Sequence, residues 1–120
     1  MIRFRIEELF IWQKSIEISD ELFNTADHLE SIKQFRFAEQ FRFATLSISN
    51  NIAEGTGSNS NSDFKKFLNY SHRSLFEVVN MLIVFNKRGY INADLLNKKK
   101  EELDHLSRML TKFSQSLSVA

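Results

Sequence analysis

The residues best suited to metal chemistry are a glutamate and a histidine near the end of the chain, in the step Glu102-Leu-Asp-His105. Di-iron sites in helical bundles use a Glu-x-x-His step on each of two helices, with a glutamate from each of two others. The step occurs once here, and the other histidines, His28 and His72, fall on different predicted helices. Because the chain also has no cysteine, thiolate metal sites and cysteine nucleophiles are excluded. We predict no metal, no cofactor and no catalytic residue.

A second candidate for chemistry is the run Asn50-Asn51-Ile-Ala-Glu54-Gly55. Asn51 falls on an apolar helix seam, where a polar side chain is costly unless it is hydrogen-bonded, and Glu54 follows one turn later. Both side chains could act on a substrate, or they could hold the next loop by bonding backbone amides. We expect the structural role, with Gly55 ending the helix in a left-handed turn.

Basic side chains are the raw material for binding nucleic acid. The formal net charge is only +1, yet residues 1–30 carry three bases and seven acids, whereas residues 31–90 carry eight bases and four acids. A basic middle can face phosphates, or it can pair with acids of the same or a neighbouring subunit. One such expected pair joins Arg42 to Glu77. The candidate nucleic-acid-binding residues are Arg36, Arg42, Lys65, Lys66 and Arg73.

Four amphipathic helices are predicted to position these side chains. Apolar residues recur at three- and four-residue steps, and the chain has no proline and only three glycines. The predicted helices cover about 8–29, 32–55, 62–88 and 93–117. Since short connections make neighbouring helices antiparallel, we predict an all-α, up-down-up-down four-helix bundle that forms a single domain over residues 1–120.

The ends of these helices carry recognisable signals. Ser31 and Gln34 form a capping-box pattern that predicts the start of the second helix. Ser60 or Ser62 can cap the third helix and Asn92 the fourth. Gly89, after two basic residues, is placed to end the third helix.

The third and fourth helices each have one clear apolar seam, and on the third Phe76, Val79 and Ile83 form a second line. The third reads Phe64, Leu68, Ser71, Leu75, Val78, Leu82 and Phe85. The fourth reads Leu96, Lys99, Leu103, Leu106, Leu110, Phe113 and Leu117. The first helix has two stripes. One runs through Leu9, Trp12, Ile16, Ser19, Phe23 and Ala26, and the other through Ile11, Ile18, Leu22 and Leu29. We assign the Trp12 stripe to the core.

Several apolar residues fall off the assigned seams. Besides Ile11 and Ile18, they are Phe35, Phe43, Leu46, Phe76, Val79 and Ile83. Large exposed apolar patches usually mark contact surfaces, so we predict that these residues form an interface between copies in a homo-oligomer. The alternative is a bundle with wide core faces and a few exposed apolar residues.

The N-terminal segment and the apolar runs bear on location. Met1-Ile-Arg-Phe-Arg-Ile-Glu-Glu meets acids before an apolar run of signal-peptide length can form. The longest strongly apolar stretch, 78–85, is far below the roughly 20 residues that span a bilayer. We expect a cytoplasmic protein that does not associate with membranes.

Several stretches together resemble a known family. They are Trp12-Gln13-Lys14, Gln40-Phe-Arg42-Phe-Ala44, Asp63-Phe64, Ser74-Leu75, Gly89-Tyr90 and, most specifically, Ser47-Ile48-Ser-Asn-Asn51-Ile52-Ala53-Glu54-Gly55. Over roughly residues 4–115 the chain resembles the bacterial four-helix-bundle family encoded in intervening sequences of 23S ribosomal RNA genes. The chain departs from the usual pattern at Ser49, Ser58 and Arg73, where proline, arginine and glycine are common.

This resemblance implies an antiparallel bundle that assembles as a homopentamer and has no established biochemical role. It also suggests a distant similarity to the accessory proteins of diversity-generating retroelements, whose basic pentameric barrels engage a reverse transcriptase and nucleic acid. Taken with the residues, it favours a non-enzymatic homo-oligomer that binds RNA, or an RNA-bound protein, through a repeated basic surface. The alternative is a protein–protein interaction scaffold that binds no nucleic acid.

Overall fold

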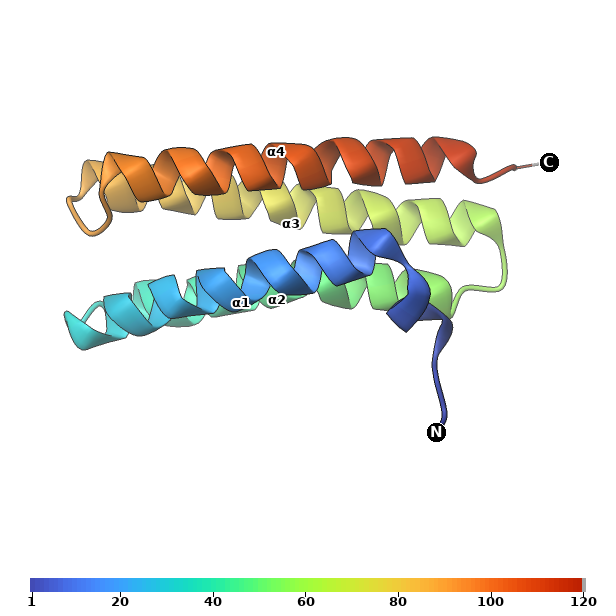
Figure 1. Ribbon diagram of the computed structural model, residues 1–120, viewed down its shortest axis with the longest axis horizontal. Helices are drawn as coiled ribbons and strands as arrows, with labels where there is room; N and C mark the ends of the chain where they lie inside the picture. Colours follow the sequence, from blue (N-terminus) through green and yellow to red (C-terminus); the bar gives the residue numbers. More distant parts are fainter. Residues whose placement is uncertain (120) are drawn as a thin grey trace.

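Four helices follow one another up and down in the computed structural model, which describes residues 1–119 (Figure 1). A short 3₁₀ helix, η1 (Arg5–Glu8), precedes α1 (Phe10–Ser31), α2 (Phe35–Thr56), α3 (Asn61–Lys87) and α4 (Ala93–Ser116). Consecutive helices pack against each other, and α4 also packs against α1, which closes the bundle. The predicted all-α, antiparallel up-down-up-down bundle is confirmed. No helix within residues 1–119 has an apolar run long enough to cross a membrane.

Three of the predicted helix-end signals act as expected. The Ser60 hydroxyl accepts the Asp63 amide at 3.1 Å, which caps α3. The Asn92 carboxamide oxygen accepts the Leu95 amide at 2.8 Å, which caps α4. Gly89, at φ +78°, follows the end of α3 in the left-handed conformation that favours glycine.

The predicted capping box at Ser31 is wrong. Ser31 is the last residue of α1, and its hydroxyl donates back to the His28 carbonyl at 2.6 Å. The chain then turns through Lys33, which takes the left-handed conformation at φ +64°. The Gln34 amide donates to the Leu29 carbonyl at 2.8 Å, the bond of a Schellman ending. The first helix therefore ends later than predicted, at Ser31, and α2 begins at Phe35.

The core follows the predicted seams of the last two helices. All seven predicted seam residues of α3 are buried, as are the first five of α4, while Phe113 and Leu117 are half-buried. On α1 the assignment is wrong in part. The stripe through Ile11 and Ile18 is buried, whereas the Trp12 stripe is buried only at Ser19 and Ala26. Trp12, Ile16 and Phe23 lie at the half-exposed edge. Ile11 and Ile18 are therefore core residues and leave no patch for a partner.

Small side chains line the contact between α2 and α3. The Ser71 hydroxyl donates to the Ile48 carbonyl at 2.7 Å, and the Ser47 and Ser74 hydroxyls are 2.9 Å apart. Gly55 lies inside α2 rather than ending it, which corrects the predicted left-handed turn. A Cβ at Gly55 would come within 2.6 Å of the Phe64 ring. Glycine is required here by close helix packing.

Candidate functional site

The predicted nucleic-acid-binding residues do not form one patch. Arg36 lies in the first turn of α2, whereas Lys65 and Lys66 lie in the first turns of α3. Because α2 and α3 are antiparallel, these turns are at opposite ends of the bundle, whose longest dimension is 49 Å. Arg42 and Arg73 lie between the two ends. A single RNA segment bound at one place cannot contact all five.

Arg42 is engaged within the chain. Its guanidinium donates to Asp27 Oδ1 at 2.7 Å and to Glu30 Oε2 at 3.1 Å, both on α1. The hydrogen bonds that Arg42 donates to Asp27 and, to a lesser extent, to Glu30 raise the pKa of Arg42 above its ordinary value. The expected ion pair with Glu77 is wrong, because Arg42 faces α1 while Glu77 lies on α3. Arg42 therefore clamps α1 to α2 and is not free to hold a phosphate.

Of the remaining predicted cations, Arg36, Lys66 and Arg73 are exposed and Lys65 is half-buried. Lys66 Nζ lies 3.6 Å from Asp63 Oδ1 and 5.2 Å from the centre of the Phe67 ring. Arg73 lines a shallow polar hollow of about 420 Å³ across α2 and α3, together with Tyr70, Glu77, Asn51 and Ser74. The acid in that hollow offsets the charge of Arg73, so the middle of α3 offers no concentrated positive surface.

The bundle gathers positive charge at one end, where both the α1–α2 and the α3–α4 connections lie (Figure 1). We call this group of four exposed residues the basic tip: Lys33, Arg36, Lys87 and Arg88. Aromatic rings join its two halves. The Arg88 guanidinium lies 6.0 Å from the centre of the Tyr90 ring, which lies 6.2 Å from that of Phe37.

Next to these rings, Lys33, Phe35, Arg36 and Phe37 line an open hollow of about 620 Å³. Among the acids at this end, Glu30 already bonds Arg42 and Asp94 lies in the first turn of α4. Of the basic tip, sequence reasoning had selected only Arg36. The antiparallel topology could have identified the other three residues, because it places the ends of the first and third helices at the same end of the bundle.

The predicted oligomer interface divides into separate regions. Phe35, Phe43 and Leu46 are exposed and, with Phe23 of α1, line a groove of about 500 Å³ along α1 and α2. Phe76 is exposed on α3, where its ring stacks at 5.0 Å on that of His72. His72 in turn bonds Ser107 of α4 at 2.5 Å. Phe76 therefore belongs to the α3–α4 side and not to the α1–α2 groove.

Two members of the predicted interface are partly covered by their own chain. Val79 and Ile83 are half-buried and pack against the hydrophobic core. Each therefore offers only part of its side chain to a partner, and their place in an interface between copies stays a prediction. We call the remaining exposed surface of Phe23, Phe35, Phe43 and Leu46 the apolar groove.

The Asn51–Glu54–Gly55 motif serves the helix rather than the loop. Asn51 is half-buried, and its amide group donates to the Ser47 carbonyl at 2.8 Å and to the Ser47 hydroxyl at 3.1 Å. Glu54 is exposed, and its carboxylate holds no backbone amide among the described residues. The prediction that both side chains hold the loop is wrong, because Asn51 bonds the Ser47 carbonyl within α2 instead. Gly55 leaves room for the Phe64 ring.

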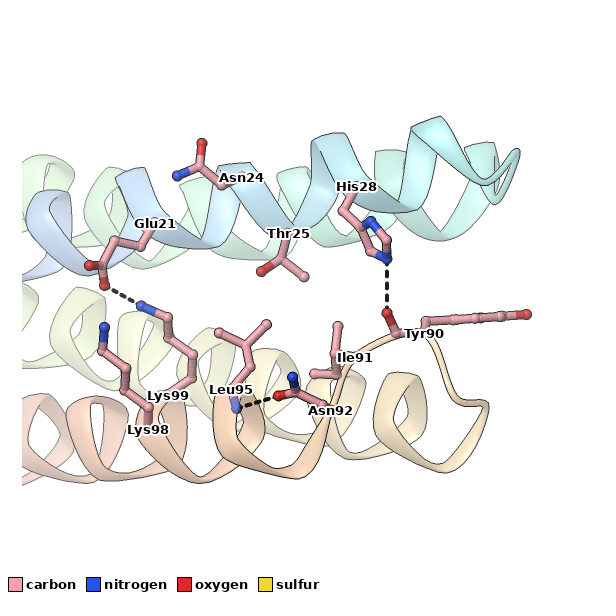
Figure 2. Close-up of a pocket in the computed structure, with 10 residues that line it drawn as sticks. All are labelled: Glu21, Asn24, Thr25, His28, Tyr90, Ile91, Asn92, Leu95, Lys98 and Lys99. Atoms are coloured by element: carbon pink, nitrogen blue, oxygen red, sulfur yellow. Dashed lines mark hydrogen bonds and ion pairs between the residues drawn. The ribbon is translucent and has the colours of Figure 1, made fainter.

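A hollow of about 430 Å³ separates α1 from the start of α4 (Figure 2). Polar contacts bound it at both ends. At one end His28 Nε2 lies 3.0 Å from the Tyr90 carbonyl oxygen. At the other, Lys99 forms an ion pair with Glu21 and lies 3.2 Å from Glu102. We call this space the α1–α4 pocket.

Lys99 is the unusual residue of the α1–α4 pocket. Its side chain is only 3% exposed although it carries a charge, while that of Glu21 is 47% exposed. The hydrogen bond from Lys99 lowers the pKa of Glu21 below its ordinary value. Sequence reasoning placed Lys99 on the core seam but could not identify Glu21, which lies 78 residues away.

The geometry does not favour a metal centre. Among residues 1–119, no three histidine or carboxylate side chains come together as metal ligands. Glu102, the first residue of the Glu-x-x-His step, bonds Lys99, and His105 is exposed. These two residues do not point to a common ligand site.

The fold and these surfaces define an antiparallel four-helix bundle with one basic end and one polar seam. The chain belongs to the family described as 23S rRNA-intervening sequence proteins, whose sequence model matches residues 7–112. The predicted family resemblance is thereby confirmed, while the similarity to retroelement accessory proteins stays a prediction.

One similar solved structure is that of a protein of unknown function from the S23 ribosomal protein family of Bacteroides thetaiotaomicron. It is 21% identical to this chain, with a TM-score of 0.83, and the alignment covers 88% of this chain and 99% of that one. At this identity the likeness supports the fold. None of the curated proteins matches the chain.

Proposed function

We propose that this is a non-enzymatic, cytoplasmic helical-bundle protein that assembles with itself and binds RNA at the basic tip. The observation that carries the RNA half is the meeting of Lys33, Arg36, Lys87 and Arg88 at one end, beside exposed Phe35 and the Tyr90 ring. Lysine and arginine contact phosphates, and aromatic rings stack on unpaired bases. A homo-oligomer repeats the tip, which raises the avidity of a patch that is weak alone.

A charge-reversal experiment tests the RNA half. We expect Lys33→Glu/Arg88→Glu to weaken binding of a single-stranded RNA oligonucleotide, measured by fluorescence anisotropy over a range of salt concentrations, and to make the dependence on salt less steep. Lys66→Glu/Arg73→Glu is the matched control, because it changes the net charge equally but lies away from the tip. Equal weakening by both variants, or no binding by the wild type near physiological salt, would contradict the proposal.

The assembly half rests on the apolar groove. The Phe43 side chain is 79% exposed in the single chain, and Phe35 and Leu46 lie beside it. We expect Phe43→Ser to lower the molar mass measured by light scattering while leaving helix content and Tm close to those of the wild type. Phe10→Ser is the control, because Phe10 is also 79% exposed but lies outside the groove. Dissociation by Phe10→Ser alone would place the interface elsewhere.

A protein–protein scaffold without nucleic acid is the second candidate. The ion pairs of Arg42 with Asp27 and Glu30 favour the scaffold, because they use this cation within the chain and leave it unavailable to a phosphate. A scaffold predicts that neither charge-reversal pair affects a measurable RNA affinity, while Phe43→Ser still disturbs association. The same two experiments therefore separate the candidates.

A further inference from the structure

The α1–α4 pocket has a lining whose unpartnered groups are mostly hydrogen-bond donors. Thr25 is only 5% exposed, and Figure 2 shows its hydroxyl directed into the space between the helices. Among residues 1–119 no hydrogen-bond partner is found for that hydroxyl, in contrast to Ser15 on the same helix, which bonds the Trp12 carbonyl at 2.7 Å. Thr25 is nearly buried as a residue, but its hydroxyl opens onto the pocket, so it can bond a group that enters there.

Two donors from the opposite wall face the same space. The Asn92 carboxamide oxygen is occupied by the Leu95 amide, which leaves its NH₂ group to point into the pocket (Figure 2). Lys98 also lines the pocket, and Figure 2 shows its ammonium group at the Glu21–Lys99 end; within residues 1–119 it forms no ion pair. The one lining carboxylate, Glu21, is already held by Lys99.

The remaining wall is apolar. Ile91 is 7% exposed and Leu95 is half-buried, and both line the pocket beneath the polar groups. The volume of about 430 Å³ lies within the range of pockets that hold small organic molecules. A ligand that suits this lining carries negatively charged oxygens for the donors and an apolar body for Ile91 and Leu95.

We propose that the α1–α4 pocket binds a small organic anion, a carboxylate or a phosphate monoester with an apolar body. The anion accepts hydrogen bonds from Thr25, Asn92 and Lys98, while the Lys99–Glu21 pair closes one end of the pocket. Charge-assisted hydrogen bonds of this kind are about twice as strong as neutral ones. This site is separate from the basic tip and does not depend on RNA binding.

Benzoate and phenyl phosphate are suitable probes, and benzamide and benzylammonium are neutral and cationic counterparts of similar shape. We expect saturable shifts of the backbone amide NMR signals of residues 24–28 and 91–98 with the two anions and none with the counterparts. The stronger of the two anions identifies carboxylate or phosphate as the preferred group. Absence of saturable shifts with both anions, or equal binding of benzylammonium, would overturn the proposal.

Three variants test the named donors without removing the fold. Thr25→Val keeps the side-chain shape, and Asn92→Asp keeps the oxygen that caps α4 while replacing the NH₂ group with a charge. We expect each, and Lys98→Gln, to weaken binding of the better anion by about tenfold or more. Lys100→Gln is the matched control, because it removes the same charge from an exposed residue of α4 outside the pocket. Equal weakening by Lys98→Gln and Lys100→Gln would overturn the proposal, because binding would then follow net charge.

Discussion

The α2–α3 contact and the α1–α4 contact are built from different kinds of side chain. Between α2 and α3, glycine and serines let the helices approach, and hydroxyl groups bond across the contact. Between α1 and α4, Lys99 reaches across to Glu21, and a pocket of about 430 Å³ remains beside it. Close packing with hydroxyl bonds therefore characterises the α2–α3 contact around Gly55 and Ser71, which we call the sealed contact. The α1–α4 contact instead combines a charged pair with a pocket between the helices.

Gly55 provides the sharpest test of the sealed contact. We expect Gly55→Val to lower the free energy of unfolding by about 1–3 kcal/mol, because the new side chain must displace the buried Phe64 ring. Urea denaturation measures the change. Gly57→Ala is the control, since a Cβ there meets only the Glu54 carbonyl oxygen at 3.5 Å. If both variants unfold at the same urea concentration, the close approach of the helices at Gly55 does not contribute to stability.

The hydroxyl groups of the sealed contact should have a smaller effect. Ser71 is fully buried and donates to the Ile48 carbonyl at 2.7 Å. We expect Ser71→Ala to cost about 0.5–1.5 kcal/mol of unfolding free energy, the usual net value of one hydrogen bond. Ser62→Ala, at an exposed position of α3, should stay within about 0.5 kcal/mol of the wild type. A Ser71 variant as stable as that control would show that the bond adds no stability.

The α1–α4 contact should tolerate loss of its charge. We expect Lys99→Met to change the unfolding free energy by less than about 1 kcal/mol, because an apolar chain fills the same buried space and the desolvation penalty disappears. Glu21, whose side chain is 47% exposed, can then be hydrated. Urea denaturation again measures the effect. A loss above about 3 kcal/mol would show that the ion pair, rather than packing, holds α4 on α1.

The contrast between these contacts also explains how much the sequence could predict. The seams of α3 and α4 could be predicted because each helix has one unbroken apolar line of three- and four-residue steps, and the buried residues follow it. On α1 two apolar stripes lie side by side, and spacing alone could not show which faces the core. A glycine such as Gly55 can mark a helix end or a place of close packing. Close packing applies here because of Phe64, and only the fold brings Phe64 next to Gly55.

The candidate sites were harder to predict for a related reason. The basic tip joins Lys33 and Arg36 to Lys87 and Arg88, which are far apart in the sequence. The α1–α4 pocket likewise joins Thr25 of α1 to Asn92 and Lys98 beside and within α4. Helix periodicity reports which face of a helix is buried, but it does not report which residues of another helix it faces. Only the topology, applied to both ends of the bundle, brings these groups together.

The smallest expected effects are those of pH, and they separate two contacts of α4. Burial lowers the pKa of His72, which bonds Ser107, so the folded state favours the neutral ring. Its contribution to stability is therefore present above the unfolded pKa of about 6.5 and is lost as pH falls below it. The Lys99 hydrogen bond lowers the pKa of Glu21, so the contribution of Glu21 is lost only at lower pH, below the ordinary carboxyl value.

We therefore expect stability, measured by urea denaturation at a series of pH values, to fall in two stages as the solution is acidified. His72→Gln should remove the first stage, the loss near pH 6.5, and leave the second. Glu21→Gln should remove the second stage, the loss at lower pH, and leave the first. Because Glu21 is half-exposed, solvent screening keeps its stage to less than about 1 kcal/mol. If Glu21→Gln leaves the acid stage unchanged, the ion pair with Lys99 adds no stability, and the α1–α4 contact is held by its apolar residues alone.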